Sequence, residues 1–180
     1  MATKSRSRLI VVLGGASSGK SDVALRLAVK GVRKSAPRAF VATGEGLDEE
    51  MAAKIARHRF SRSPTWVTAE VPEELTGWFE KCGAKYPVVV VDCLTMWLSN
   101  RCRRGRAEKG VLRDLLKLLR SVRRAAARVV LVTNELGMGL VPADAPSRRF
   151  RELAGTVNRL VAERADEVYL VVSGLSVRLK

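Results

Sequence analysis

The chain has 180 residues, of which 47% are apolar and 28% are charged, and its formal net charge is +15. This length suits one domain with its own hydrophobic core. No apolar run approaches the ~20 residues that a membrane-spanning helix needs, and the run after the basic N-terminus is too short for a secretory signal peptide. Cys82, Cys93 and Cys102 are odd in number and lack C-x-x-C spacing, which favours reduced thiols in a cytoplasmic protein over a zinc site.

Most of the positive charge lies in two segments. Residues 101–128 hold eleven Lys and Arg against Glu108 and Asp114, and the first eight residues hold three more. One interpretation is a nucleic-acid partner; others are a solvated, arginine-rich helix face or the attraction of anionic substrates. Because no aromatic residue interleaves with the basic run, base stacking lacks support, and we expect no nucleic-acid partner.

Strand and helix patterns alternate along the chain. Continuous runs of Val, Ile, Leu and Ala, typical of strands buried on both faces of a parallel sheet, predict strands at 9–13, 39–42, 66–69, 88–92, 129–132 and 168–172. Apolar residues at helical spacing predict helices at 21–32, 47–59, 112–122 and 150–161. The polar, glycine-containing stretch 101–110 predicts a flexible loop, and Ser173-Gly174 predicts the turn of a final hairpin.

One stretch indicates a class of ligand. It fits the phosphate-binding loop (P-loop) pattern G-x-x-x-x-G-K-[ST] without a mismatch and consists of Gly14, Gly15, Ala16, Ser17, Ser18, Gly19, Lys20 and Ser21. Glycines let backbone N–H groups surround a phosphate at a helix N-terminus, where the helix dipole favours negative charge. Lys20 can reach the β and γ phosphates, and the Ser21 hydroxyl can bind Mg²⁺. The alternative is a glycine turn that only joins a strand to a helix.

The motif and the alternation together predict the fold class. We expect an α/β P-loop NTPase with a RecA-like, doubly wound, mostly parallel sheet, helices on both of its faces and a C-terminal hairpin. Residues 9–180 are predicted to form a single nucleotide-binding domain. Residues 1–8 are basic and are predicted to be a flexible extension.

Two acidic residues follow predicted strands. Asp92 ends the strand 88–92 at the place where P-loop enzymes hold Mg²⁺, although an aspartate here can also cap the next segment. Glu135 lies just past another strand end, where doubly wound sheets bind ligands. It could bind Mg²⁺ or guanine, orient a hydroxyl, or cap a turn. Cys93 is interpreted as a core residue.

His58 is the only histidine and lies on the predicted helix 47–59. A lone histidine on a helix is more often structural or solvated than catalytic. Its neighbours Arg57, Arg59 and Arg62 would hold phosphates near it and favour the neutral, nucleophilic imidazole.

Several motifs in this order resemble the bifunctional adenosylcobinamide kinase / adenosylcobinamide-phosphate guanylyltransferase family of cobalamin biosynthesis. The resemblance covers residues 9–180, and the P-loop alone is shared with many NTPases. The more specific motifs are the segment 47–55 with His58, Thr65-Trp66, the block N-E-L-G-M-G-L-V-P at 134–142, F-R-E-L-A-G-T-V-N at 150–158 and A-D-E-V-Y-L-V-V-S-G at 165–174.

The resemblance implies two reactions on one P-loop, with Mg²⁺ and with ATP and GTP as substrates. A nucleoside triphosphate phosphorylates adenosylcobinamide, and GTP then transfers GMP to that phosphate through a guanylylated histidine, for which His58 stands at the matching place. It also implies a homo-oligomer, a trimer as in family members. The chain departs from the family pattern at three places. Asp92 stands where some members carry Glu, and Arg57-His58 stands where some members carry two adjacent histidines. The region after Asn100 is shorter and more basic than in some members.

Two other functions remain open from the residues. One is a different small-molecule kinase that uses the same loop, with His58 as framework. The other is a RecA-like ATPase that binds nucleic acid through the basic segment, with an affinity that falls steeply with salt.

Overall fold

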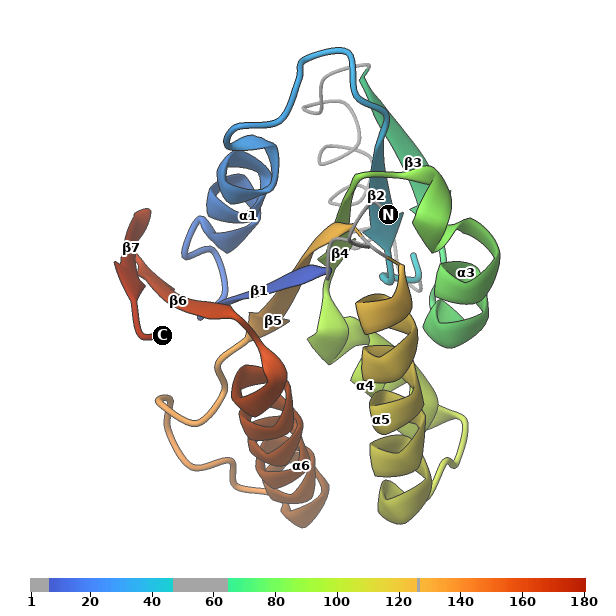
Figure 1. Cartoon of the computed structure of the whole chain (residues 1–180). Coiled ribbons are helices and arrows are strands. Elements are labelled where there is room, and N and C mark those ends of the chain that lie inside the picture. The colour runs from blue at the N-terminus through green and yellow to red at the C-terminus, as the bar shows by residue number, and fades with distance from the viewer. Residues whose placement is uncertain (1–6, 47–64, 126) are drawn as a thin grey trace.

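The structure, a computed structural model, describes residues 7–46, 65–125 and 127–180, and the predicted helix 47–59 lies outside them. Within the described residues, seven strands form one sheet in the order β3-β2-β4-β5-β1-β6-β7 (Figure 1). Strands β1 to β6 are parallel and β7 is antiparallel to β6. The predicted parallel sheet with a C-terminal hairpin is therefore confirmed.

The element bounds extend several of the predicted ranges by a few residues. The strands are β1 (Arg8–Gly14), β2 (Arg38–Ala42), β3 (Trp66–Glu70), β4 (Val88–Asp92), β5 (Arg128–Asn134), β6 (Glu167–Val172) and β7 (Leu175–Arg178). The helices are α1 (Lys20–Val29), α3 (Leu75–Cys82), α4 (Leu94–Arg103), α5 (Glu108–Arg124) and α6 (Ala145–Arg164), with a 3-10 turn, η1, at Gly83–Lys85. None of these helices is long and apolar enough to cross a membrane.

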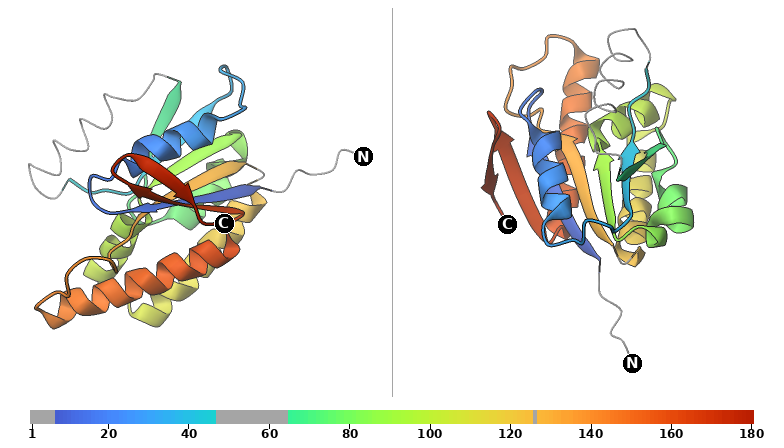
Figure 2. Two further views of the ribbon diagram at one scale, coloured as in Figure 1. Left: turned by 90° about the vertical axis from the view of Figure 1, so that its left-hand side faces the viewer. Right: turned by 90° about the horizontal axis from the view of Figure 1, so that it is seen from above.

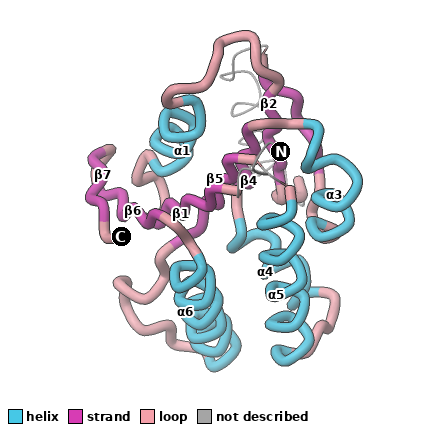
Figure 3. Tube along the Cα trace, in the orientation of Figure 1, coloured by secondary structure: helices cyan, strands magenta, loops and turns pink. Residues whose placement is uncertain are grey.

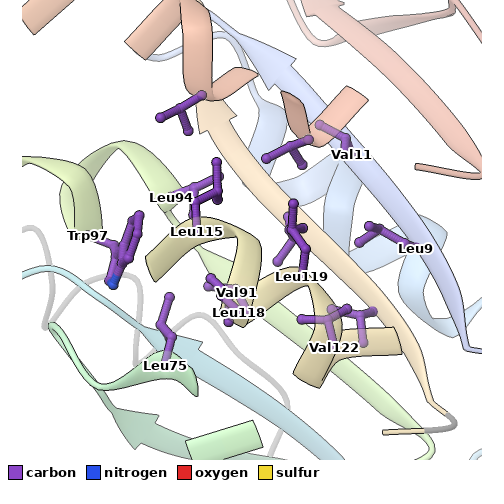
Figure 4. Close-up of a cluster of buried hydrophobic side chains, with 14 of the residues drawn as sticks. Leu9, Val11, Leu75, Val91, Leu94, Trp97, Leu115, Leu118, Leu119 and Val122 are labelled. Atoms are coloured by element: carbon purple, nitrogen blue, oxygen red, sulfur yellow. The ribbon is translucent and has the colours of Figure 1, made fainter. Parts of the chain in front are cut away.

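The central strands are buried on both faces because helices cover both sides of the sheet. Alternate side chains of β1, such as Ile10 and Val12, pack with α1, while Leu9 and Val11 pack with α4, α5 and α6. Figure 1 shows α1 above the sheet and α4, α5 and α6 below it, and Figure 2 shows the same layers from two other sides. The apolar cluster beneath the sheet, drawn in Figure 4, is centred on α5 and Trp97 of α4. This two-sided burial explains the continuous apolar runs in the sequence.

The predicted loop at 101–110 is largely wrong. Residues 101–103 end α4 and residues 108–110 begin α5, so only 104–107 connect the two helices (Figure 3). Arg101 is held in the helix because its guanidinium donates to Asp114 of α5 and pairs with Glu74. Arg101, one of the charged residues that suggested a loop, thus connects α4 to α5 and to the start of α3.

The last helix and the hairpin follow local signals. Asp144 is the N-cap of α6, since its Oδ1 accepts from the Ser147 amide at 2.8 Å. Ser173 and Gly174 both have positive φ, 51° and 79°, and connect Val172 to its partner Leu175. Two positive φ values are what a two-residue hairpin turn requires, and the predicted turn is confirmed.

Replacement of Leu115 tests how much the apolar cluster beneath the sheet contributes to stability. The Leu115 side chain is fully buried, so we expect Leu115→Ala to lower the free energy of unfolding by about 2–5 kcal/mol, through lost transfer energy and the cavity left behind. The neighbouring Leu116 is only half-buried, and Leu116→Ala should cost less than half as much. Urea unfolding followed by circular dichroism measures both, and equal losses would contradict the packing described.

Candidate functional site

The carboxyl ends of three parallel strands bring the predicted site together. Gly14 ends β1 and pairs in register with Asn134 at the end of β5. Asp92 ends β4, directly beside β5. Ligands of open α/β sheets bind at this edge, and α1 begins there at Lys20. The P-loop residues and Asp92, which lie far apart in the sequence, therefore share one edge of the sheet.

The P-loop has the backbone that a phosphate cradle needs. Ser17 and Gly19 have positive φ, 56° and 85°, so the chain turns sharply before α1. The Lys20 ammonium donates to the Gly15 carbonyl at 2.9 Å, which folds its side chain back over the loop. The Ser18 hydroxyl is buried and has no hydrogen-bond partner among the described residues.

Gly14 has no room for a side chain. An added Cβ would lie 2.5 Å from Ser18 Oγ and 2.7 Å from the carbonyl oxygen of Val171 in β6. The first glycine of the motif is therefore required by close packing against β6. At Gly15, by contrast, an added Cβ would meet nothing within 4 Å.

The C-terminal hairpin supports the P-loop from outside. The Gly174 amide donates to the Ser18 carbonyl at 2.9 Å. A Cβ added at Gly19 would lie 3.2 Å from the Gly174 Cα, so the two glycines approach closely. The turn at Ser173-Gly174 is thus part of the site's framework, a role that the hairpin signal in the sequence did not predict.

Ser21 and Asp92 form a hydroxyl–carboxylate pair. Ser21 Oγ donates to Asp92 Oδ2 at 2.6 Å, so one hydroxyl and one carboxylate converge beside the P-loop. These are hard oxygen ligands of the kind Mg²⁺ prefers, with phosphate oxygens completing its coordination in nucleotide sites. In the part of the chain that the structure describes, no three His, Cys, Asp or Glu side chains gather to hold a metal without such a substrate.

Cys93, next to Asp92, is a buried residue, as interpreted. Burial, and then the charge of Asp92, raise the pKa of the Cys93 thiol to about 11. The thiol is therefore protonated at neutral pH, and a reactive thiolate is disfavoured. Thr43, the residue after β2, holds the Cys93 backbone, since its Oγ1 accepts from the Cys93 amide at 2.8 Å and donates to the Cys93 carbonyl at 2.6 Å.

A closed ring of buried hydrogen bonds fixes the end of β5. The Asn134 amide donates to Thr95 Oγ1 (2.7 Å), which contacts Thr133 Oγ1 (3.0 Å). Thr133 Oγ1 donates to Asn158 Oδ1 (2.8 Å), and Asn158 Nδ2 donates back to the Asn134 carbonyl (2.9 Å). Since Thr133 gives its proton to Asn158, Thr95 is the donor in the hydroxyl pair. Single threonines and an asparagine gave no separate signal in the sequence.

Glu135 follows this ring and takes part in a turn. Its Oε1 accepts from the Gly137 amide at 2.6 Å, and its own amide donates to the Gly14 carbonyl at 3.0 Å. The second contact places Glu135 beside the P-loop. Residues 136–142 then expose Met138, Leu140 and Val141, with exposed fractions of 77%, 96% and 74%.

The remaining predicted site residues, His58, Arg57, Arg59 and Arg62, lie outside the described residues. The segment that contains them starts after Gly46. The carboxylate of the preceding Glu45 pairs with Arg103, the last residue of α4, and with Arg104 just after it. Although burial opposes ionisation, these two guanidinium groups lower the pKa of Glu45.

Comparison with known proteins identifies the family. Residues 10–179 match the family described as cobinamide kinase / cobinamide phosphate guanyltransferase. The chain belongs to this family. It is 37% identical to the bifunctional adenosylcobalamin biosynthesis protein CobU of Salmonella typhimurium, over 96% of this chain and 99% of that one. It is 38% identical to CobP of Pseudomonas aeruginosa, over 94% and 96% of the two chains.

Solved structures agree on the fold of this cobinamide kinase / guanyltransferase family member. The flagellar accessory protein FlaH of Methanocaldococcus jannaschii superposes with a TM-score of 0.59 over 97% of this chain and 79% of that one, at 16% identity. The RadB recombinase superposes with a TM-score of 0.53 over 92% and 74% of the two chains, also at 16% identity. At such identities the likeness concerns the fold alone, and the predicted RecA-like P-loop NTPase fold is confirmed.

The two glycines at the start of the P-loop give a matched pair of variants. Gly14→Ala must displace Ser18 or β6, so we expect a loss of about 1–3 kcal/mol in the free energy of unfolding and roughly tenfold weaker binding of a fluorescent GTP analogue. Gly15→Ala has open space and should change stability by less than about 0.5 kcal/mol. Thermal unfolding and nucleotide titration measure both, and tight binding by Gly14→Ala would refute the packing argument.

Proposed function

We propose that this chain catalyses two successive steps of adenosylcobalamin biosynthesis. In the first, the γ-phosphoryl group of ATP or GTP passes to the aminopropanol hydroxyl of adenosylcobinamide. In the second, GMP passes from GTP to that phosphate, giving adenosylcobinamide-GDP and pyrophosphate. Membership of the cobinamide kinase / cobinamide phosphate guanyltransferase family over residues 10–179 supports this proposal. So do relatives that match it over nearly their full length.

The observation on which the proposal depends most is the contact between Ser21, the last residue of the P-loop motif, and Asp92 at the end of β4. The loop amides and Lys20 would hold the β and γ phosphates of the nucleotide. Ser21 and Asp92, 2.6 Å apart, would hold Mg²⁺, which when bound neutralises charge developing on the transferred phosphate. Residues 9–180 would form the single nucleotide-binding domain for both steps.

His58 is proposed as the nucleophile of the second step. A neutral imidazole nitrogen attacks the α-phosphorus of GTP, the bond to the β-phosphate oxygen breaks, and pyrophosphate leaves. The cobinamide phosphate then attacks the phosphoramidate, and the histidine is released. Arg57, Arg59 and Arg62 would bind phosphate oxygens next to it.

Glu135 is proposed to contact the nucleotide with the carboxylate oxygen that does not accept from Gly137. The backbone contact of Glu135 with Gly14 supports a place at the same edge. The reciprocal hydrogen bonds between Asn134 and the ring behind it would keep this strand end rigid while ligands exchange.

A homotrimer in the cytoplasm is proposed from family resemblance. The exposed Met138, Leu140 and Val141, and Leu175 and Val177 on the edge strand β7, support an oligomer because apolar side chains gathered on a surface often mark contacts between subunits.

Turnover of adenosylcobinamide tests the two reactions. With ATP alone we expect adenosylcobinamide phosphate, and with GTP both the phosphate and the GDP product, resolved by chromatography. Asp92→Asn should lower the rate of phosphorylation by roughly 100-fold or more, since phosphoryl transfer depends on the cation. Formation of neither product, together with ATP hydrolysis stimulated by nucleic acid, would favour the nucleic-acid-dependent ATPase instead.

Labelling with α-labelled GTP tests His58 separately. We expect an acid-labile, alkali-stable label on the unmodified protein that His58→Ala abolishes, because a phosphoramidate hydrolyses in acid. His58→Ala should still phosphorylate adenosylcobinamide, whereas Asp92→Asn loses that activity. An active enzyme that never takes up label, or a label that persists in His58→Ala, would rule out the histidine intermediate.

A further inference from the structure

Helix α5 presents an uninterrupted row of basic side chains to solvent. We call this row the α5 stripe; its members are Lys109, Arg113, Lys117, Arg120 and Arg124. All five are exposed, and their spacings of four, four, three and four residues keep them within about 80° around the helix axis. The row extends over about 22 Å, at 1.5 Å per residue. No acidic residue lies within this face of the helix.

The α5 stripe is not used by the protein's own ion pairs. No hydrogen bond or ion pair joins the side chains of its members to any other residue in the ranges 7–46, 65–125 and 127–180. Other arginines nearby do have ion-pair partners. Arg101 and Arg106 both pair with Asp114, and Arg123 pairs with Asp166. The stripe thus keeps five like charges together at an electrostatic cost and without internal compensation.

A cleft continues the stripe at the C-terminal end of α5. It has a volume of about 760 Å³, and Arg120 and Arg124 of the stripe lie on its wall. Arg123, Arg164 and Lys180 add further cations, and Glu163 and Asp166 are the acidic residues of the lining. The half-buried Leu116 is the accessible leucine of the wall, with the buried Leu9 and Leu119 beneath it. The lining therefore holds five cationic and two acidic side chains, and its excess of positive charge suits an anionic group.

The stripe and cleft lie away from the nucleotide site. The cleft includes Leu9 at the start of β1, whereas the P-loop follows Gly14 at the other end of that strand. Figure 1 shows α5 below the sheet, on the face opposite α1. The charge here does not serve to hold the triphosphate at the P-loop.

We propose that the α5 stripe docks the protein on an anionic lipid bilayer, with an acidic phospholipid head group seated in the adjoining cleft. A basic row on one side of a helix suits a flat anionic surface, to which each Lys or Arg adds about a fivefold factor in affinity. Leu116 on the cleft wall offers an apolar contact for the glycerol and first methylenes of a lipid, which a nucleic-acid phosphate would not use. No aromatic side chain lies on the stripe to stack a base.

Vesicle co-sedimentation tests the proposal on the full-length chain. Vesicles of phosphatidylcholine with about 40 mol% phosphatidylglycerol should bind the protein at about 0.1 M salt and release it at about 0.5 M, where charge interactions are screened. Vesicles of phosphatidylcholine alone should not bind it. The triple variant Arg113→Glu, Lys117→Glu, Arg120→Glu should lower the partition coefficient by at least 100-fold.

The control is a variant with the same change in net charge on the opposite face. Arg26, Lys30 and Lys34 are exposed on or just after α1, and their replacement by Glu should lower binding by less than about tenfold, as a general effect of net charge. A triple Gln variant at positions 113, 117 and 120 repeats the test with a smaller perturbation, and circular dichroism checks that each variant is folded.

The outcomes are distinct. Equal losses in the two charge-reversal variants would overturn the proposal, because binding would then follow net charge alone. It would also be overturned if duplex DNA or RNA at equal phosphate concentration displaced the protein from vesicles through the same three residues. Since no cobinamide or GTP is present, failure here leaves the proposed enzymatic function untouched, and the reverse also holds.

Discussion

The close approach of Gly14 to Ser18 and to the Val171 carbonyl holds the P-loop against the sheet. Because β6 pairs with β1 in parallel register, the P-loop can only take its shape if residue 14 has no side chain. The same register aligns Gly14 with Asn134 of β5, and β5 in turn pairs with β4, which ends at Asp92. The positions of the P-loop, of the Asp92 carboxylate and of the end of β5 therefore depend on one set of strand pairings.

Polar groups at this edge are organised by buried hydrogen bonds. Thr95, Thr133 and Asn158 are buried and satisfy one another and the Asn134 backbone. Leaving any one of them unpaired would cost about 1–3 kcal/mol, so the ring favours a single geometry at the end of β5. Thr43 has the same effect on the backbone of Cys93, the residue after Asp92. The strand ends beside the proposed nucleotide site are thus fixed from within the protein core.

Charge is divided between two functions on this molecule. Around α4 the charges are paired within the protein: Arg101 of α4 binds Asp114 of α5, Arg103 binds Glu45 after β2, and Arg104 binds Glu73 before α3. On the outer face of α5 the charge is unpaired and directed to solvent. A net charge of +15 alone cannot distinguish these two uses, and only the second leaves charge available for a partner.

The sequence by itself determined the α/β class, six strands of the parallel sheet, the hairpin turn and the P-loop, because apolar runs, two-residue turns and glycine patterns act over a few neighbouring residues. It misjudged residues 101–110, where contacts with distant acidic side chains extend two helices, and gave no sign of the ring through Thr95 and Asn158. Its assignments of His58 and of the phosphate-binding arginines stay predictions. Only the tertiary structure decided that Ser21 meets Asp92, that Gly174 supports Ser18, and which arginines remain unpaired. These features join residues far apart in the chain, and their geometry is fixed by strand register and helix packing.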